Sequence, residues 1–82
     1  MISPLILGFR SANYALGIYV YGNNRLTARD GFTGVANGYY TPTEQYAANN
    51  LDKSVIDNAL TMTWINDTEY SETIALIPAV TK

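Results

Sequence analysis

The sequence has 82 residues, of which 48 % are apolar and only 15 % are charged, and its formal net charge is −2. It holds neither histidine nor cysteine, which excludes disulfides, catalysis by imidazole or thiol groups, and the usual ligands of zinc, copper and haem. A chain of this length forms one small domain, and such domains often need a disulfide, a metal or a partner chain for stability. We therefore expect residues 1–82 to be a single domain that binds other proteins and uses no cofactor.

Residues 1–40 have the composition of short strands separated by turns. Residues 14–21 (YALGIYVY) are rich in aromatic and β-branched side chains, which favours a strand. Three turn signals follow at intervals of about eight residues: Gly22-Asn23-Asn24, Asp30-Gly31 and Asn37-Gly38. This pattern predicts a β-meander. Because glycines weaken strands, the alternative is an extended arm that becomes ordered only against a partner.

Helix-start signals begin after residue 40. Thr41-Pro42-Thr43-Glu44 has the form of a capping box with proline at the first helical position, and Asn49-Asn50 interrupts the short helix that it opens. Asp52 is the predicted cap of a second helix. Four apolar side chains of this second helix recur at helical spacing and predict a buried face: Val55, Ile56, Ala59 and Leu60.

The clearest local signal in the chain lies at Asn66-Asp67-Thr68-Glu69. Asn66 is the predicted N-cap of a last helix, and Glu69 completes a capping box with it. Acidic side chains in a first helical turn also suit the positive end of the helix dipole. Residues 52–77 therefore predict two helices joined by a tight turn at Trp64-Ile65-Asn66.

Together these patterns predict an α+β fold. A short N-terminal β-meander or extended arm over residues 1–40 would be followed by two or three short helices over residues 41–78.

The chain holds seven tyrosines and few charges, which is typical of a surface that another protein covers. The alternative is that these rings lie in the core or on strands, where aromatic residues are common. The side chains that we predict to contact a partner lie in the first half of the chain: Tyr14, Ile18, Tyr19, Tyr21, Phe32, Tyr39 and Tyr40. Ile18 and its apolar neighbours could equally belong to the core.

Charge is divided unevenly along the chain. Residues 1–43 hold three arginines against one aspartate, whereas residues 44–82 hold two lysines against six acidic residues. This asymmetry could let copies of the chain meet head to tail, although it is also typical of a solvated helical face. Three scattered arginines do not make a basic groove, so we do not expect nucleic-acid binding.

The acidic residues do not predict a catalytic site, because helix starts and polar helix faces account for them. We therefore expect no enzymatic activity. The longest charge-free stretch, residues 11–24, is too short to cross a membrane, and nothing in the sequence resembles a targeting segment. We expect a protein that is not bound to membranes.

The segment Val55–Leu76 carries a recognisable arrangement of residues. Trp64-Ile65-Asn66, Glu69-Tyr70 and Ile74 lie there, with Gly38-Tyr39-Tyr40-Thr41 upstream. This arrangement resembles the helix–turn–helix of small tailed-phage proteins of the XkdX type, over roughly residues 38–77. The resemblance implies a bacteriophage origin, a viral protein of the virion or its assembly, and a location in the virion or the host cytoplasm.

We therefore expect a non-catalytic structural or assembly protein that is a small subunit or accessory component of a phage particle. Its partners would be proteins, either copies of itself in a homo-oligomer or a larger virion assembly. The alternative is a small phage-encoded inhibitor or regulator that binds one host protein.

Overall fold

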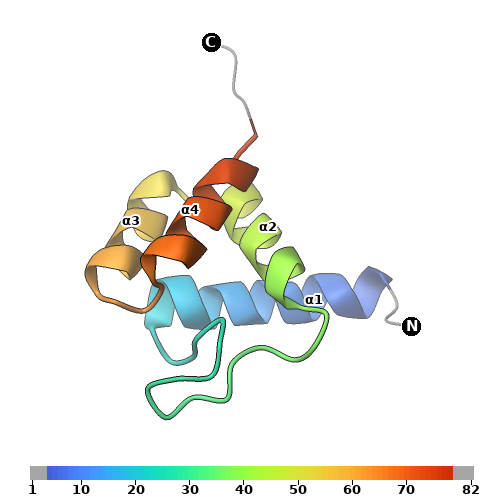
Figure 1. Ribbon diagram of the computed structural model, residues 1–82. Helices are drawn as coiled ribbons and strands as arrows, with labels where there is room; N and C mark the ends of the chain where they lie inside the picture. The colour runs from blue at the N-terminus through green and yellow to red at the C-terminus, as the bar shows by residue number, and fades with distance from the viewer. Residues whose placement is uncertain (1–3, 79–82) are drawn as a thin grey trace.

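The computed structural model describes the backbone of residues 4–78 and the side chains of residues 8–78, and every regular element in this range is a helix (Figure 1). The elements are α1 (Pro4–Ala15), the π-helix η1 (Leu16–Tyr21), α2 (Tyr40–Asn50), α3 (Lys53–Thr61) and α4 (Asp67–Leu76). No β-strand is present among the described residues. The predicted α+β fold with an N-terminal β-meander is therefore wrong, and this part of the chain is all-α.

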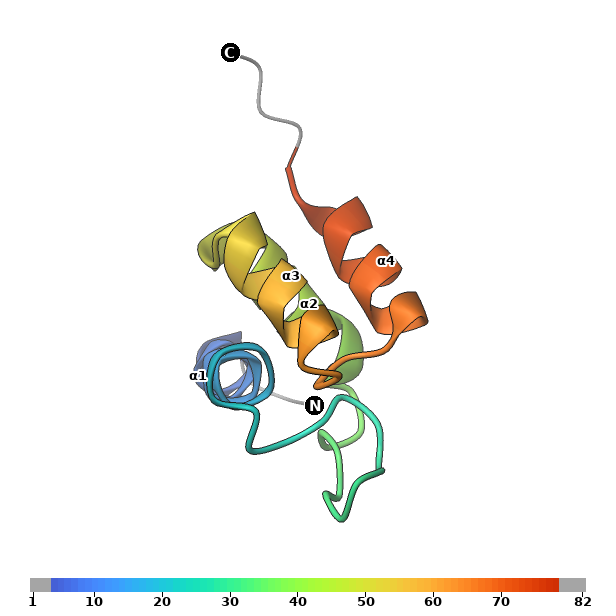
Figure 2. The same cartoon turned by 90° about the vertical axis from the view of Figure 1, so that its left-hand side faces the viewer.

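α1 and η1 form one continuous rod, and the other helices pack on one side of it (Figure 1). α1 contacts α2, η1 contacts α3, and α4 packs against both α2 and α3. Figure 2 looks nearly along the rod and shows α2, α3 and α4 on the same side of α1. The rod is thus the base on which the remaining helices rest.

Residues 14–21 are helical and not the predicted strand. The buried side chains Ser11, Ala15, Ile18 and Tyr19 follow the spacing of one helix face, which packs on the core. Gly22 ends the rod in the left-handed conformation, with φ of 68°, and its N–H donates to the Gly17 carbonyl. The β-forming composition of this segment is overridden because β-propensity mainly reflects the packing of side chains, which a buried helix face also provides.

The loop between the rod and α2, residues 22–39, keeps a predicted turn but not the predicted strands. Asp30 and Gly31 both have positive φ, 56° and 86°, and the Phe32 N–H donates to the Arg29 carbonyl at 2.8 Å. Only an isolated bridge forms there, between Arg29 and Phe32. A two-residue turn fixes its own geometry, but a lone hairpin without further strands is marginal.

The loop 22–39 packs on the chain's own helices. Leu26 and Tyr39 are 2 % and 3 % exposed. Arg25 pairs with Asp30 at 2.9 Å, donates to the Gly22 and Asn24 carbonyls, and lies over the Phe32 ring. An extended arm over residues 1–40 is therefore also wrong, because residues 4–21 are helical and the following loop is ordered against α1 and α4.

The helices of the second half lie close to their predicted places. α2 begins at Tyr40, two residues before the predicted first position at Pro42, so the predicted capping box of Thr41 and Glu44 does not form; the N-cap is Tyr39, which makes no capping hydrogen bond through its side chain. It ends at Asn50, as the paired asparagines predict. Asp52 is the N-cap residue of α3, as predicted, but its side chain makes no capping hydrogen bond.

The capping box at the start of α4 is confirmed. The Glu69 N–H donates to Asn66 Oδ1 at 2.7 Å, and the Asn66 N–H donates to Glu69 Oε1 at 2.9 Å. The predicted pair of helices over residues 52–77, with a turn between them, is confirmed as well. One core unites the elements, and its buried members are Ala15, Ile18, Tyr19, Leu26, Ala47, Ile56, Ala59 and Ile65.

Candidate interaction surface

The outward face of the α1–η1 rod exposes large apolar side chains. Phe9 is 64 % exposed and Tyr21 is 66 % exposed, and Val20 is also on the surface. Arg10 is the only charged residue in the sequence of the rod. Large apolar side chains exposed along an element with so little charge are the features of a surface that binds protein.

The single charge of the rod is engaged with aromatic rings. Arg10 Nη2 donates to the Tyr14 hydroxyl at 2.9 Å, and its guanidinium carbon lies 4.9 Å from the centroid of the Tyr39 ring. The rings of Tyr14 and Tyr39 pack edge to face, 5.4 Å apart. Because the guanidinium sits on these rings, it is held toward the start of α2.

A groove whose described lining carries no charged residue lies between α1 and α2. Its volume is about 310 Å³, and its lining exposes mainly apolar atoms. The described residues that line it are Gly8, Ser11, Pro42, Gln45, Tyr46, Asn49 and Asn50. A Cβ atom at Gly8 would meet no atom within 4 Å, so the wall of the groove is open at this point.

One wall of the groove carries an unsatisfied hydroxyl. Ser11 is 4 % exposed, and its Oγ has no hydrogen-bond partner among the described residues. A buried hydroxyl without a partner costs free energy, typically about 1–3 kcal/mol in proteins.

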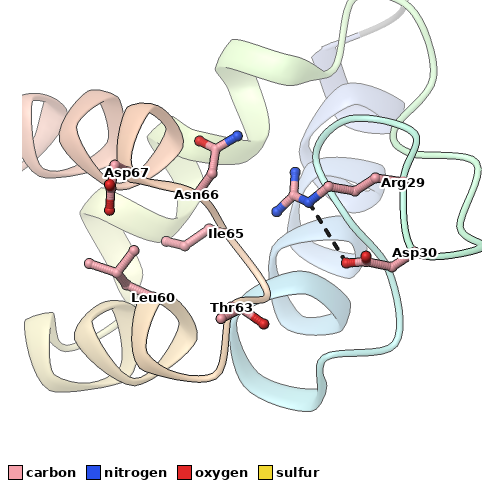
Figure 3. A pocket seen from close by; sticks show the side chains of 7 residues that line it. All are labelled: Arg29, Asp30, Leu60, Thr63, Ile65, Asn66 and Asp67. Carbon is pink, nitrogen blue, oxygen red and sulfur yellow. Dashed lines mark ion pairs between the residues drawn. The ribbon is translucent and has the colours of Figure 1, made fainter.

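A second hollow lies where the loop 22–39 meets the turn before α4 (Figure 3). Its volume is about 390 Å³, and it is lined by Arg29, Asp30, Leu60, Thr63, Ile65, Asn66 and Asp67. Arg29 Nη1 and Nη2 donate to the two carboxylate oxygens of Glu69, each at 3.1 Å, and Nη2 also donates to the Trp64 carbonyl. Its Nε lies 3.8 Å from Asp30 Oδ2 (dashed line in Figure 3). The guanidinium is therefore occupied within the chain.

The Arg29–Glu69 pair holds the loop on α4. Glu69 is 1 % exposed, and besides Arg29 it accepts hydrogen bonds from the Thr27 hydroxyl and the Asn66 N–H. A bidentate arginine–carboxylate pair with further hydrogen bonds meets the conditions under which a buried ion pair is tolerated. The chemistry of this hollow is structural: it fixes a long loop that has no strand pairing.

A buried carboxyl on α2 has a different environment. Glu44 is 2 % exposed, and burial raises its pKa to about 8, helped by a hydrogen bond and like charge from Glu72 and by the charge of Glu69. The Tyr40 hydroxyl donates to Glu72 Oε1 at 2.6 Å. Burial and then this bond to Glu72 raise the pKa of Tyr40. The environment of Glu44 therefore favours its neutral, protonated form at neutral pH.

Charged groups gather on α3 and α4. The Tyr70 hydroxyl donates to Asp57 at 2.6 Å, and Lys53 donates to both Asp57 oxygens at 3.1 Å. The bond from Tyr70 and then the bond from Lys53 lower the pKa of Asp57, while Asp57 raises the pKa of Lys53. The charges of Lys53 and Asp57 are thus paired within the chain.

Three of the predicted contact residues lie inside the chain. Ile18 and Tyr19 are fully buried, and Tyr39 is 3 % exposed. The Tyr19 hydroxyl shares a hydrogen bond of 2.7 Å with Thr73 Oγ1, and burial raises the pKa of Tyr19. These three side chains contact the chain's own core, which is the alternative that the sequence left open.

The other four predicted contact residues reach the surface to different extents. Tyr14 accepts a bond from the Ala36 N–H at 3.2 Å and is half-buried, as are Tyr40 and Phe32. Tyr21 is the member of the set that is mostly exposed. Partner contact through these residues stays a prediction.

Sequence reasoning missed Phe9, Val20 and the groove at Gly8 and Ser11. A helix predicted over residues 8–21 would have placed Phe9 and Val20 on a different face from the buried residues. Ser11, Ala15 and Ile18 already have the spacing of one helix face. The aromatic and β-branched composition of the segment concealed that signal.

Comparisons with protein-family profiles, with curated proteins and with solved structures found no match. Within residues 4–78, no helix has the length and apolar character needed to cross a membrane. Among the described side chains, no cluster of three or more acidic residues is placed to hold a metal ion. The resemblance to XkdX-type phage proteins stays a prediction.

Proposed function

We propose that this chain is a non-catalytic structural or assembly protein, and that it acts by binding other protein chains through the α1–η1 rod. The observation that supports this proposal most strongly is the exposure of Phe9 and Tyr21 on an element whose single charge, Arg10, is occupied by aromatic rings. Exposed aromatic side chains on an element with few charges are typical of protein interfaces.

The acidic side chains support the same proposal because their environments are structural. Glu69 is neutralised by Arg29, Asp57 is held by Tyr70 and Lys53, and Glu44 is buried against Glu72. Each of these carboxyl groups ties one segment of the chain to another, and a catalytic acid or base needs access to a substrate.

The resemblance of residues 38–77 to XkdX-type proteins narrows the proposal to a small subunit or accessory component of a phage particle. The number of copies of the chain in each phage particle tests this proposal. Particles from producing cells would be purified by density gradient, and the chain would be quantified by mass spectrometry against an isotope-labelled standard. A structural component is expected at a fixed number of several copies per particle.

Two results would contradict the proposal. One is recovery of the chain only in a one-to-one complex with a single host protein, which would support an inhibitor or regulator. The other is turnover of a small molecule by the purified chain, which would show that it is an enzyme.

A further inference from the structure

We infer that Asn37 is a site of spontaneous covalent modification, at which water converts the asparagine to aspartate and isoaspartate with loss of ammonia. The modification is independent of the proposed function. Three features of the molecule carry the inference: the turn that joins the loop 22–39 to α2, the groups of this turn that make no hydrogen bond, and the contacts that the turn holds in place.

The turn at Asn37-Gly38 is tight and lies on the surface. The Tyr39 N–H donates to the Ala36 carbonyl at 3.0 Å, and Asn37 and Gly38 are both exposed. Gly38 has a φ of 90°, in the left-handed region that favours glycine. The fold therefore favours glycine at the position that follows Asn37.

A glycine after an asparagine makes the side-chain amide reactive. The backbone nitrogen of Gly38 can attack Cγ of Asn37, because no Cβ atom at residue 38 hinders the approach. A bond forms between Cγ and this nitrogen, and the side-chain nitrogen leaves as ammonia with the proton of the Gly38 N–H. The product is a five-membered succinimide. Water then opens the ring at Cγ to give aspartate, or at the main-chain carbonyl to give isoaspartate.

The fold leaves both reacting groups accessible. Among the described residues, no hydrogen bond engages the Gly38 N–H or the Asn37 side chain. The turn at Asp30-Gly31 provides an internal comparison, because Asp30 Oδ2 accepts a hydrogen bond from Arg25 Nε at 2.9 Å. A paired carboxylate resists attack by a nitrogen nucleophile, so we expect Asp30 to stay unchanged.

None of the other asparagines precedes a glycine. Asn50 is followed by Leu51, whose N–H donates to the Ala47 carbonyl at 3.0 Å and is therefore engaged. The side chain of Asn66 is held as well, because its Oδ1 accepts from the Glu69 N–H. The reaction is therefore expected at Asn37 first.

The two products change the turn in different ways. Aspartate leaves the main chain unchanged and adds one negative charge to the net charge of −2. The new charge lies just before α2, whose first turn holds no acidic side chain and whose dipole favours an anion at this end. Isoaspartate adds the same charge, but it also inserts one carbon atom into the main chain between Ala36 and Tyr39.

The inserted carbon disturbs the start of α2. Tyr39 is the N-cap of α2 and is 3 % exposed, and its ring packs edge to face on the Tyr14 ring, 5.4 Å away. On the other side of the turn, the Ala36 N–H donates to the Tyr14 hydroxyl at 3.2 Å. A longer main chain between these two anchors displaces one of them. The isoaspartyl form is therefore expected to be less stable than the aspartyl form.

The first experiment is incubation of the purified chain in warm, mildly alkaline buffer. Isoelectric focusing is expected to show a more acidic species, whose mass differs from that of the starting chain by the conversion of one amide to an acid. Peptide mapping by mass spectrometry, with electron-transfer fragmentation to distinguish the two products, is expected to locate both at Asn37. The reaction there is expected to be about tenfold faster than at any other asparagine, because only Asn37 precedes a glycine.

Two variants provide matched controls. Asn37→Gln keeps an amide, but its longer side chain would have to close a six-membered ring, so this variant is expected to stay unmodified. Asn37→Asp supplies the aspartyl product with an unchanged main chain and is expected to unfold at the wild-type temperature or above it. Calorimetry of the incubated wild-type chain is expected to show a second transition at lower temperature, from the isoaspartyl form.

The inference fails if the folded chain stays unmodified, and reaction of the urea-unfolded chain alone would show that the turn protects Asn37. It also fails if another asparagine reacts first. If the incubated chain shows only the transition of Asn37→Asp, the inserted carbon does not disturb α2, and this part of the inference is wrong. None of these results changes the number of copies in a particle, so the proposed function is tested separately.

Discussion

Two carboxyl groups on different helices, Glu69 of α4 and Glu44 of α2, are buried almost equally in this small molecule, at 1 % and 2 % exposure. The carboxylate of Glu69 accepts two hydrogen bonds from the guanidinium of Arg29 and two more, from the Thr27 hydroxyl and the Asn66 N–H. Glu44 faces Glu72, and one of its oxygens has no partner among the described residues. Equal burial therefore produces an ion pair in one region and a neutral acid in the other. The difference shows that the partner, and not the depth, decides how a buried carboxyl contributes to stability.

The largest expected loss of stability comes from removing the cation that pairs with Glu69. Arg29→Met leaves Glu69 buried without its charge partner, and the free energy of unfolding is expected to fall by about 3–5 kcal/mol. Chemical denaturation measures the loss. The double variant Arg29→Met/Glu69→Gln removes the charge as well and is expected to recover part of it. If the single variant is as stable as wild type, the ion pair is not what holds the loop 22–39.

The buried carboxyl of Glu44 makes the stability of the fold depend on pH. The pKa of Glu44 is about 8 in the folded chain, against an ordinary value of 4.5, so the folded state holds the extra proton between these values. The contribution of Glu44 to stability is therefore largest below about pH 4.5 and declines as the pH rises toward 8. Thermal unfolding across this range measures the decline.

A matched variant isolates Glu44 from the other acidic groups. Glu44→Gln keeps the shape and a hydrogen-bond donor but cannot ionise, so it is expected to flatten the pH profile and to exceed wild-type stability near pH 8. Equal slopes for the variant and the wild type would mean that Glu44 does not hold the proton.

A smaller effect sharpens the comparison by separating the two roles of Glu69. Asn66→Ala removes the capping hydrogen bond to the Glu69 N–H but leaves the ion pair with Arg29 intact. The expected loss is about 1 kcal/mol, the usual value for an N-cap. Urea denaturation would show it, and Asn66→Asp is the control that keeps the cap. A loss as large as that of Arg29→Met would show that the cap and the ion pair act as one unit.

The smallest effect tests the outermost hydrogen bond of the network. The Thr27 hydroxyl donates to Glu69 Oε2 at 3.2 Å from an exposed position in the loop. Thr27→Val keeps the shape and is expected to cost about 0.5 kcal/mol, since solvent can replace this bond. Hydrogen exchange of the loop amides is the most sensitive readout. A loss above that of Asn66→Ala would show that this hydrogen bond stabilises the fold more than the cap does.

The outcome at α4 and at the rod shows how far sequence reasoning reaches. Asn66 and Glu69 are three residues apart and satisfy each other's backbone groups, so their pattern alone located the start of α4. At residues 14–21 the local composition favoured a strand, but the segment is helical because its buried face packs against the other helices. The exposed Tyr21 was among the predicted contact residues, while Phe9, Val20 and the groove depend on the helical register and were missed.

The sequence by itself determined the features whose physics is local: the capping box before α4, the end of α2 at Asn50, and the left-handed turns at Gly22 and Gly31. Tertiary structure alone decided the helical state of residues 14–21, the pairing of Arg29 with Glu69 across 40 residues, and the different states of the two buried carboxyls. The physical reason is the separation in sequence between the groups that interact. Caps and turns depend on neighbours within a few residues, whereas burial and charge pairing depend on which distant segments the fold brings together.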